Sequence, residues 1–130
     1  MKEVYDFLKK CQVYYLATVE GGQPRVRPFG TLDLYDGRLA FQTANTKPVA
    51  AQIKANPKIE ISAFDGSQWI RLEAEAYIDD RREARVHMLD AHPQLKDRYQ
   101  PDDGVTTVFY LKNVTAVISS FTAAPKTIKF

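Results

Sequence analysis

Two arginines stand two positions apart in the segment Arg25–Gly30, which reads RVRPFG. If this segment is a β-strand, Arg25 and Arg27 project from the same face, because neighbouring side chains alternate along a strand. Two guanidinium groups on one face can hold an anion bidentately, as phosphate binding often requires. Pro28 cannot donate to a sheet ladder, which leaves nearby backbone groups free for a ligand or a bulge. A solvated strand face with an edge proline also explains the segment, and explains it better when the segment is taken alone.

A second candidate for phosphate binding lies where a predicted strand runs into a predicted helix, in the segment Phe41–Pro48. A helix N-terminus presents unpaired N–H groups and a partial positive charge, and both favour a phosphate. Thr43, Asn45 and Thr46 add neutral hydrogen-bonding groups, and Lys47 adds a full positive charge. Ordinary helix capping explains Asn45 and Thr46 completely and leaves only Lys47 over. The glycine fingerprints of dinucleotide and nucleoside triphosphate sites are not present.

An aromatic side chain stands on the polar face of the strand predicted at residues 68–79. Alternation in this segment predicts one apolar face, made of Ile70, Leu72, Ala74, Ala76 and Ile78. Trp69 and Arg71 fall on the opposite, otherwise charged face. An aromatic there indicates contact with a helix of the same chain, with a second subunit or with a ligand ring. At the other end of the chain, Ser119–Thr122 is expected to be a frayed terminus.

The chain offers little for nucleophilic or metal-assisted catalysis. Cys11 lies on the apolar stripe of the first predicted helix, where a small buried hydrophobe is expected rather than a thiolate. His87 and His92 are five positions apart, which on a helix separates them by roughly 140° and prevents joint ligation of one metal. No serine or cysteine stands in a nucleophile-elbow context. We therefore expect no metal site, and we assign no catalytic residue.

Composition and charge exclude several classes of protein. The 130 residues form one expected domain, 1–130, and 45% hydrophobic with 26% charged residues is typical of a soluble globular protein. A net charge of +2 does not favour a nucleic-acid surface. No apolar run approaches the roughly 18 residues of a membrane span, and the N-terminus lacks a signal peptide. The single cysteine excludes an intrachain disulfide and fits a reducing, cytoplasmic setting.

Hydrophobic periodicity and turn residues predict a mainly β fold with short helices. The predicted helices are residues 2–11, 47–55 and 80–91, with Val86 and Leu89 as the apolar positions of the last. The predicted strands are residues 13–19, 23–35 (one strand or a bent pair), 39–43, 58–64, 68–79, 105–111 and 114–121. Tyr35–Arg38 is predicted to be a hairpin turn. Six or more closely spaced strands indicate a small, mostly antiparallel barrel with helices over its openings.

In their order and spacing, these segments resemble the pyridoxamine 5'-phosphate oxidase-like flavoproteins, the FMN-binding split-barrel family, in a short single-domain form. The similarity covers nearly the whole chain. It is carried by the following stretches: Tyr15–Thr18, Pro24–Gly30, Leu39–Thr43 with Lys47, Gln52–Ile53, Asn56–Pro57 and Trp69–Glu73. The resemblance implies a homodimer of six-stranded antiparallel split β-barrels that binds two FMN molecules in the groove between the subunits.

The resemblance also implies which residues bind the cofactor. Arg25 and Arg27 match the basic strand that meets the flavin and its phosphate, and Pro28 and Phe29 match the backbone along the isoalloxazine ring. The other positions that match the family's cofactor site are Gln42, Thr43, Asn45, Lys47, Gln52, Trp69 and Arg71. Of these, Asn45 and Lys47 match the phosphate-binding helix start, and Trp69 and Arg71 match the strand that the other subunit contributes.

The resemblance leaves the reaction open. Residues 124–130 hold no counterpart of the arginine- and histidine-bearing motif with which true pyridoxamine phosphate oxidases bind the substrate phosphate. We therefore expect an FMN-dependent oxidoreductase, similar to a flavin reductase, that acts on an unidentified small molecule. The alternatives are a flavin-binding module without turnover, a barrel that binds haem through His87 or His92 or binds a deazaflavin, and an interaction barrel without a cofactor.

Overall fold

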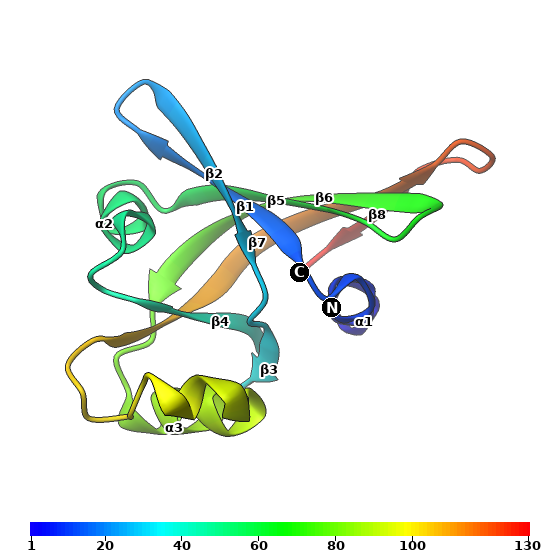
Figure 1. Ribbon diagram of the computed structural model, residues 1–130. Coiled ribbons are helices and arrows are strands. Elements are labelled where there is room, and N and C mark those ends of the chain that lie inside the picture. The colour runs from blue at the N-terminus through cyan, green and yellow to red at the C-terminus, as the bar shows by residue number, and fades with distance from the viewer.

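An eight-stranded antiparallel β-sheet frames the molecule, and three α-helices lie around it in the computed structural model, which describes all residues 1–130 (Figure 1). The helices are α1 (Lys2–Cys11), α2 (Pro48–Ala55) and α3 (Arg82–Ala91), and a 3-10 helix, η1 (Pro93–Asp97), follows α3. The strands are β1 (Tyr14–Glu20), β2 (Gln23–Phe29), β3 (Asp33–Tyr35), β4 (Arg38–Ala44), β5 (Lys58–Phe64), β6 (Gln68–Ile78), β7 (Thr106–Ser120) and β8 (Lys126–Lys129). They pair in the order β2-β1-β5-β6-β7-β4-β3, with β8 on β7. The predicted mainly β, antiparallel split-barrel class is confirmed, and the sheet is open rather than closed.

The apolar core follows the predicted alternation. Ile70 and Leu72 of β6 are fully buried, and Ile61 of the neighbouring strand β5 is buried beside them. Ile78 keeps the same parity but is 38% exposed, because it stands at the last position of β6 and lines an open polar pocket rather than the core. The prediction for Ile78 is therefore wrong, although the period-two pattern holds for the rest of the strand.

The sequence predicts two strands separated by Lys112–Asn113, whereas the structure has the single strand β7. Asn113 has a left-handed backbone with φ of 54°, and the register between β6 and β7 shifts opposite it, between Glu73 and Glu75. The Asn113 side-chain amide donates to Glu75 Oε2 at 2.9 Å. One left-handed residue makes a bulge that bends a strand and does not reverse it. The two halves of β7 consequently pair with different strands, β4 and β8.

The seven predicted strands become eight because one predicted segment is divided, two are joined in β7, and the strand β8 is additional. The segment predicted at residues 23–35 is divided into β2 and β3. The C-terminal end is not frayed, because β8 pairs with β7 and Phe130 exchanges two backbone hydrogen bonds with Val114. The predicted turn at Tyr35–Arg38 is confirmed, since it joins β3 to β4 through two positive-φ residues, Asp36 and Gly37.

The helices differ from prediction mainly at their ends. In α2 the cap position is Lys47, and no side chain caps the helix, so the prediction that Asn45 or Thr46 caps it is wrong. Asn45 instead donates its amide to Gly104 O at 2.8 Å. In α3 the predicted Val86 is only half-buried; Ala84 and Met88 are buried instead, because they pack on the face of β4 and β7.

Apolar side chains are exposed on the outer face of the β1–β2 pair. Tyr15 is 52% exposed and Val26 is 68% exposed, and the register of the pair places both on the same face. Trp69, at the start of β6, packs against the 90% exposed Phe121 with their ring centroids 5.0 Å apart. Figure 1 shows that the β1–β2 hairpin projects to the upper left, whereas the β5–β6 and β7–β8 hairpins both project to the right.

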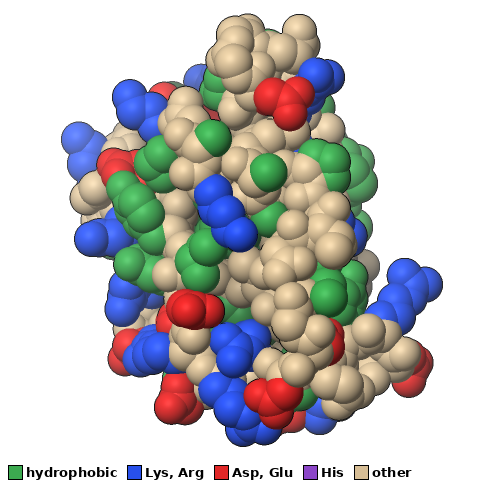
Figure 2. Space-filling view, turned by 90° about the vertical axis from the view of Figure 1, so that its left-hand side faces the viewer, with side chains coloured by type: hydrophobic (Ala, Val, Ile, Leu, Met, Phe, Trp, Pro, Cys, Tyr) green, Lys and Arg blue, Asp and Glu red, His purple; other side chains and the backbone are tan.

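Charges of both signs are interspersed on the side of the molecule that carries α2. Figure 2 shows acidic and basic side chains gathered together toward the α3 end, and a more hydrophobic middle. None of the helices has the length and hydrophobicity that spanning a membrane requires. No group of three or more His, Cys, Asp or Glu side chains is placed to hold a metal ion.

We predict that Asn113→Val destabilises the protein, whereas Asn113→Gly is better tolerated. A left-handed backbone costs a branched side chain about 1–2 kcal/mol, and glycine avoids this cost. The free energy of unfolding from urea titration measures both changes. Lys112→Val is the control for β-branching at the neighbouring position. Equal stability of the valine and glycine variants at 113 would contradict the bulge.

Candidate functional site

A hollow of about 450 Å³ lies between the end of β2, the end of β4, the start of α2 and the η1 segment. Five residues that the family resemblance assigns to the cofactor line it: Pro28, Phe29, Gln42, Thr43 and Lys47. They come from three separate elements of the chain, and the fold brings them to one place. This hollow is the candidate functional site.

Two of the residues that line the hollow each carry a buried side-chain atom with no hydrogen-bond partner within the chain. These atoms are the side-chain Nε2 of Gln42 and the Oγ1 of Thr43, on residues only 5% and 3% exposed. The Gln42 backbone is held in place by Thr31, whose hydroxyl donates to Gln42 O at 2.9 Å and accepts from Gln42 N at 3.1 Å. A buried polar group without a partner costs about 1–3 kcal/mol, so these atoms indicate a ligand with complementary polar groups.

A cation and an aromatic wall complete this side of the hollow. Lys47 is exposed and takes part in none of the ion pairs of the chain, and it stands directly before the first turn of α2. Its charge and the positive end of the helix act in the same direction and favour an anion. Phe29 packs edge-on against Phe41, with ring centroids 5.3 Å apart. The hollow therefore offers an anion site beside an apolar wall.

The guanidinium group of Arg27 donates its hydrogen bonds to acceptors within the chain. Its Nη1 donates to Leu16 O at 3.2 Å and to Thr18 Oγ1 at 2.8 Å, and its Nη2 donates to Gln52 Oε1 at 2.6 Å. Burial, and beyond it the charge of Arg25, lowers the pKa of Arg27. Arg27 thus ties β2 to β1 and to α2, and it does not line the hollow.

Arg25 and Gln52 belong to the same polar cluster as Arg27. Arg25 Nη2 forms an exposed ion pair with Glu20 Oε1 at 2.9 Å, and Gln52 Nε2 donates to Glu20 Oε2 at 3.3 Å. Arg25 and Arg27 do share a face, as the alternation predicts. Their donors contact Glu20, Gln52 and β1, and neither Arg25 nor Gln52 lines the hollow.

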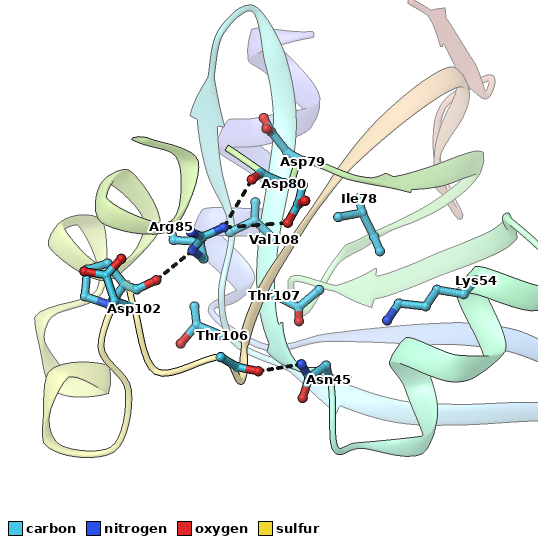
Figure 3. A pocket seen from close by; sticks show the side chains of 12 residues that line it. Asn45, Lys54, Ile78, Asp79, Asp80, Arg85, Asp102, Thr106, Thr107 and Val108 are labelled. Atoms are coloured by element: carbon cyan, nitrogen blue, oxygen red, sulfur yellow. Dashed lines mark hydrogen bonds and ion pairs between the residues drawn. The ribbon is translucent and has the colours of Figure 1, made fainter. Parts of the chain in front are cut away.

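Asn45 lines a different, neighbouring pocket of about 430 Å³ (Figure 3). One of the two cations of that pocket has partners: Arg85 Nε donates to Pro101 O at 2.7 Å, and Arg85 Nη1 lies 3.8 Å from Asp80 Oδ1. Figure 3 shows Lys54 reaching toward this pocket from the side of α2. No buried polar side chain of this pocket lacks a hydrogen bond, so it presents a weaker case for a ligand.

Trp69 and Arg71 lie away from the hollow. Both are on β6 near the tip of the β5–β6 hairpin, which Figure 1 shows on the side of the molecule opposite α2. Arg71 is exposed and forms no ion pair. A single chain therefore does not bring these two residues to the hollow that Lys47 and Gln42 line.

The η1 segment and the two residues after it form a second wall of the hollow, which no pattern in the sequence predicted. Its lining residues are Gln94, Leu95, Asp97, Arg98 and Tyr99. Along the sequence, only the predicted interruption of a helix at His92–Pro93 marked this segment. The wall is placed by a long-range contact, in which Leu32 N donates to Nε2 of the buried His92 at 3.2 Å.

The chain matches a known family over most of its length. A family model described as pyridoxamine 5'-phosphate oxidase matches residues 1–117. The structure of a NimC/NimA family protein from Clostridium acetobutylicum superposes with a TM-score of 0.97; its sequence is 46% identical, and the match covers 100% of this chain and 92% of that one. No curated protein matches the chain significantly by sequence.

More distant structures share the fold. A pyridoxamine 5'-phosphate oxidase-related, FMN-binding protein from Nostoc punctiforme has a TM-score of 0.67 at 15% identity, over 99% of this chain and 95% of that one. A heme-binding protein from Mycobacterium smegmatis has a TM-score of 0.77 at 18% identity, over 98% of this chain and 56% of that one. The fold thus occurs in proteins named for different cofactors, and the fold alone does not identify the ligand.

We predict that Arg27→Leu lowers the free energy of unfolding by about 2 kcal/mol, because it removes the hydrogen bonds that Arg27 donates to Leu16 O, Thr18 Oγ1 and Gln52 Oε1. Arg25→Leu is the matched control on the same strand face. Since an exposed ion pair contributes at most about 1 kcal/mol, we expect the smaller loss there. Urea unfolding followed by circular dichroism compares the two variants. Equal losses would show that Arg27 is not part of a structural cluster.

Proposed function

The chain belongs to the pyridoxamine 5'-phosphate oxidase family, and from this premise we propose that it is a homodimeric, FMN-dependent oxidoreductase of a small molecule. The observation that carries the proposal is the pair of unpartnered buried polar atoms on Gln42 and Thr43 beside the unpaired Lys47. This combination of a cation, polar groups and an apolar wall fits a phosphorylated flavin.

The residues present fit FMN by their chemistry. Lys47 and the start of α2 would hold the phosphate. Gln42 and Thr43 would form hydrogen bonds with polar atoms of the flavin, and Phe29 with Pro28 would supply its apolar wall. When bound, FMN supplies hydride or electron transfer, so the chain needs no acid–base pair of its own. Lys47 is assigned the phosphate ahead of Arg25 and Arg27, because both arginines already have partners.

A second copy of the chain would complete the site. Trp69 does not line the hollow of its own chain, and the exposed Tyr15 and Val26 form an apolar surface of the kind that marks protein–protein interfaces. We propose that this face pairs two chains and that the partner's Trp69 and Arg71 border the flavin. A cytoplasmic location fits the single, half-buried Cys11.

FMN is favoured over haem by the state of the two histidines. Both ring nitrogens of His92 have partners, Leu32 N at 3.2 Å and Met88 O at 3.0 Å. Nε2 of His87 lies 2.7 Å from Asp33 Oδ2, and neither histidine lines the hollow. An axial haem ligand would have to break one of these contacts or use the remaining nitrogen of His87, outside the hollow.

We predict that the purified protein binds one FMN per chain and that Lys47→Ala weakens the affinity about ten- to a hundredfold, the cost of one charge-assisted hydrogen bond. Quenching of FMN fluorescence measures the dissociation constant. Lys54→Ala is the matched control, because Lys54 lies on α2, which Lys47 precedes, also forms no ion pair and lines the neighbouring pocket.

Equal FMN affinity of the two lysine variants would refute the phosphate assignment, and a wild-type protein without FMN affinity would refute the proposed function. Reoxidation of the reduced flavin then separates an enzyme from a carrier. Turnover with one class of acceptor faster than with free FMN supports the enzyme. Reoxidation at the rate of free FMN favours a flavin-binding module.

We predict that Val26→Glu dissociates the dimer and abolishes FMN binding, because a buried unpaired carboxylate is strongly unfavourable. Sedimentation velocity measures the mass, and fluorescence of Trp69, the single tryptophan, reports whether FMN quenches it. Phe130→Glu, at the C-terminal end, is the control. A Val26→Glu dimer that still binds FMN would contradict this interface.

A further inference from the structure

A threonine side chain takes the place of a strand partner at the edge of the hollow. The register of β3 and β4 pairs Asp33 with Ala40, and continuing this register by two residues sets Thr31 opposite Gln42. Thr31 lies outside β3, but its hydroxyl donates to Gln42 O at 2.9 Å and accepts from Gln42 N at 3.1 Å. One side chain thus satisfies both backbone groups that a paired strand would otherwise satisfy.

Thr31 is itself held from two sides. Tyr14 is buried and donates its hydroxyl to Thr31 O at 2.6 Å. Burial raises the pKa of Tyr14, so the phenol keeps the proton that it donates. The next residue, Leu32, donates its backbone N–H to Nε2 of the buried His92 at 3.2 Å. A residue that is fixed on both sides can hold its hydroxyl in a defined position.

The hydroxyl of Thr31 has no hydrogen left to donate to a ligand. A threonine hydroxyl offers one donor hydrogen and two acceptor lone pairs. The carbonyl oxygen of Gln42 takes the hydrogen, and the backbone N–H of Gln42 uses one of the lone pairs. Although Thr31 lines the hollow, its hydroxyl therefore acts first on the backbone of Gln42.

The side-chain amide of Gln42 requires a fixed backbone. Its Nε2 is buried and has no partner in the chain, and the residue lines the hollow. A hydrogen bond from Nε2 to a ligand requires a donor–acceptor distance of about 2.7–3.2 Å, so a small displacement of the backbone loses it. On one edge of β4, Gln42 lies opposite Val108 of β7. On the other edge, next to the hollow, Thr31 holds it in place of a strand.

We propose that Thr31 is a positioning residue, which directs the side-chain amide of Gln42 at the ligand of the hollow. The inference rests on the proposed function, in which Gln42 forms a hydrogen bond with the flavin. Thr31 contributes to the affinity for the cofactor through Gln42 and not through a contact of its own. Removal of its hydroxyl therefore weakens binding only while residue 42 carries an amide.

The test is a double-mutant cycle on the dissociation constant of FMN, measured by quenching of its fluorescence. Thr31→Val keeps the shape of the side chain and removes the hydroxyl, and Gln42→Leu removes the amide. We expect each single variant to weaken binding about five- to tenfold, the cost of one hydrogen bond. The double variant should bind within twofold of Gln42→Leu alone, because two residues that act through one contact are not additive. Thr31→Ser keeps the hydroxyl and should retain the wild-type affinity within twofold, and Thr31→Ala replaces the valine variant if that one does not fold.

Thr107→Val is the matched control. Thr107 is also buried and donates its hydroxyl to a backbone carbonyl, Val105 O at 3.1 Å, but it does not line the hollow. It should lose stability in urea unfolding and keep its affinity for FMN. The inference is overturned if Thr31→Val binds FMN as tightly as the wild type, or if Thr107→Val loses as much affinity. Losses that multiply in the double variant also overturn it, since Thr31 would then act without Gln42.

Failure of the proposed function gives a different result. If the wild type binds no FMN, that function is refuted, and NMR on the protein as purified decides whether Thr31 positions the amide. Nitrogen relaxation of the Gln42 side-chain amide measures its mobility without any cofactor. We expect this amide to become more mobile in Thr31→Val and to stay unchanged in Thr31→Ser and Thr107→Val. Unchanged mobility in Thr31→Val would refute the positioning role.

Discussion

The polar end of β4 imposes the constraint on which the site depends. Gln42 and Thr43 are buried by the packing of the strand, yet Gln42 Nε2 and Thr43 Oγ1 find no partner in the chain. Each such atom costs about 1–3 kcal/mol, which the core must offset. These two atoms belong to residues that line the hollow, where β2, β4 and the start of α2 meet and where Lys47 and Phe29 also lie. Unsatisfied polarity, a free cation and an apolar wall together are what a phosphorylated ring compound requires.

The cations of the chain divide into two groups with different physical roles. Arg27 is partly buried and its donors hold β1, β2 and α2 together, so its charge contributes to the fold. Lys47 and Arg98 are exposed, line the hollow and have no partners, so their charges are available to ligands. The two groups cannot be told apart by residue type, because both contain side chains that suit a phosphate. The difference lies in which acceptors the fold brings within reach.

The local features of the fold could be predicted from the sequence, because they depend on neighbours along the chain. The alternation around Ile70 and Leu72 predicted β6, and Asp36 and Gly37 predicted the β3–β4 turn. The order of the motifs also predicted the family, which the family match confirms. The prediction of two separate strands was wrong at Asn113, because a polar residue within a strand indicates either a turn or a bulge. β7 pairs with β6 on both sides of Asn113, and this pairing identifies the feature as a bulge.

By itself, the sequence determined most of the elements, most of their apolar positions and the residue types that suit a flavin. Only the tertiary structure decided which of those residues meet. Arg27 and Gln52, 25 positions apart, bind each other rather than the hollow. His92 and Leu32, 60 positions apart, place the η1 wall opposite Lys47. Such contacts form only when long loops close, and the free-energy cost of that closure is entropic. Contacts of this kind leave no periodic pattern along the chain, so the sequence does not predict them.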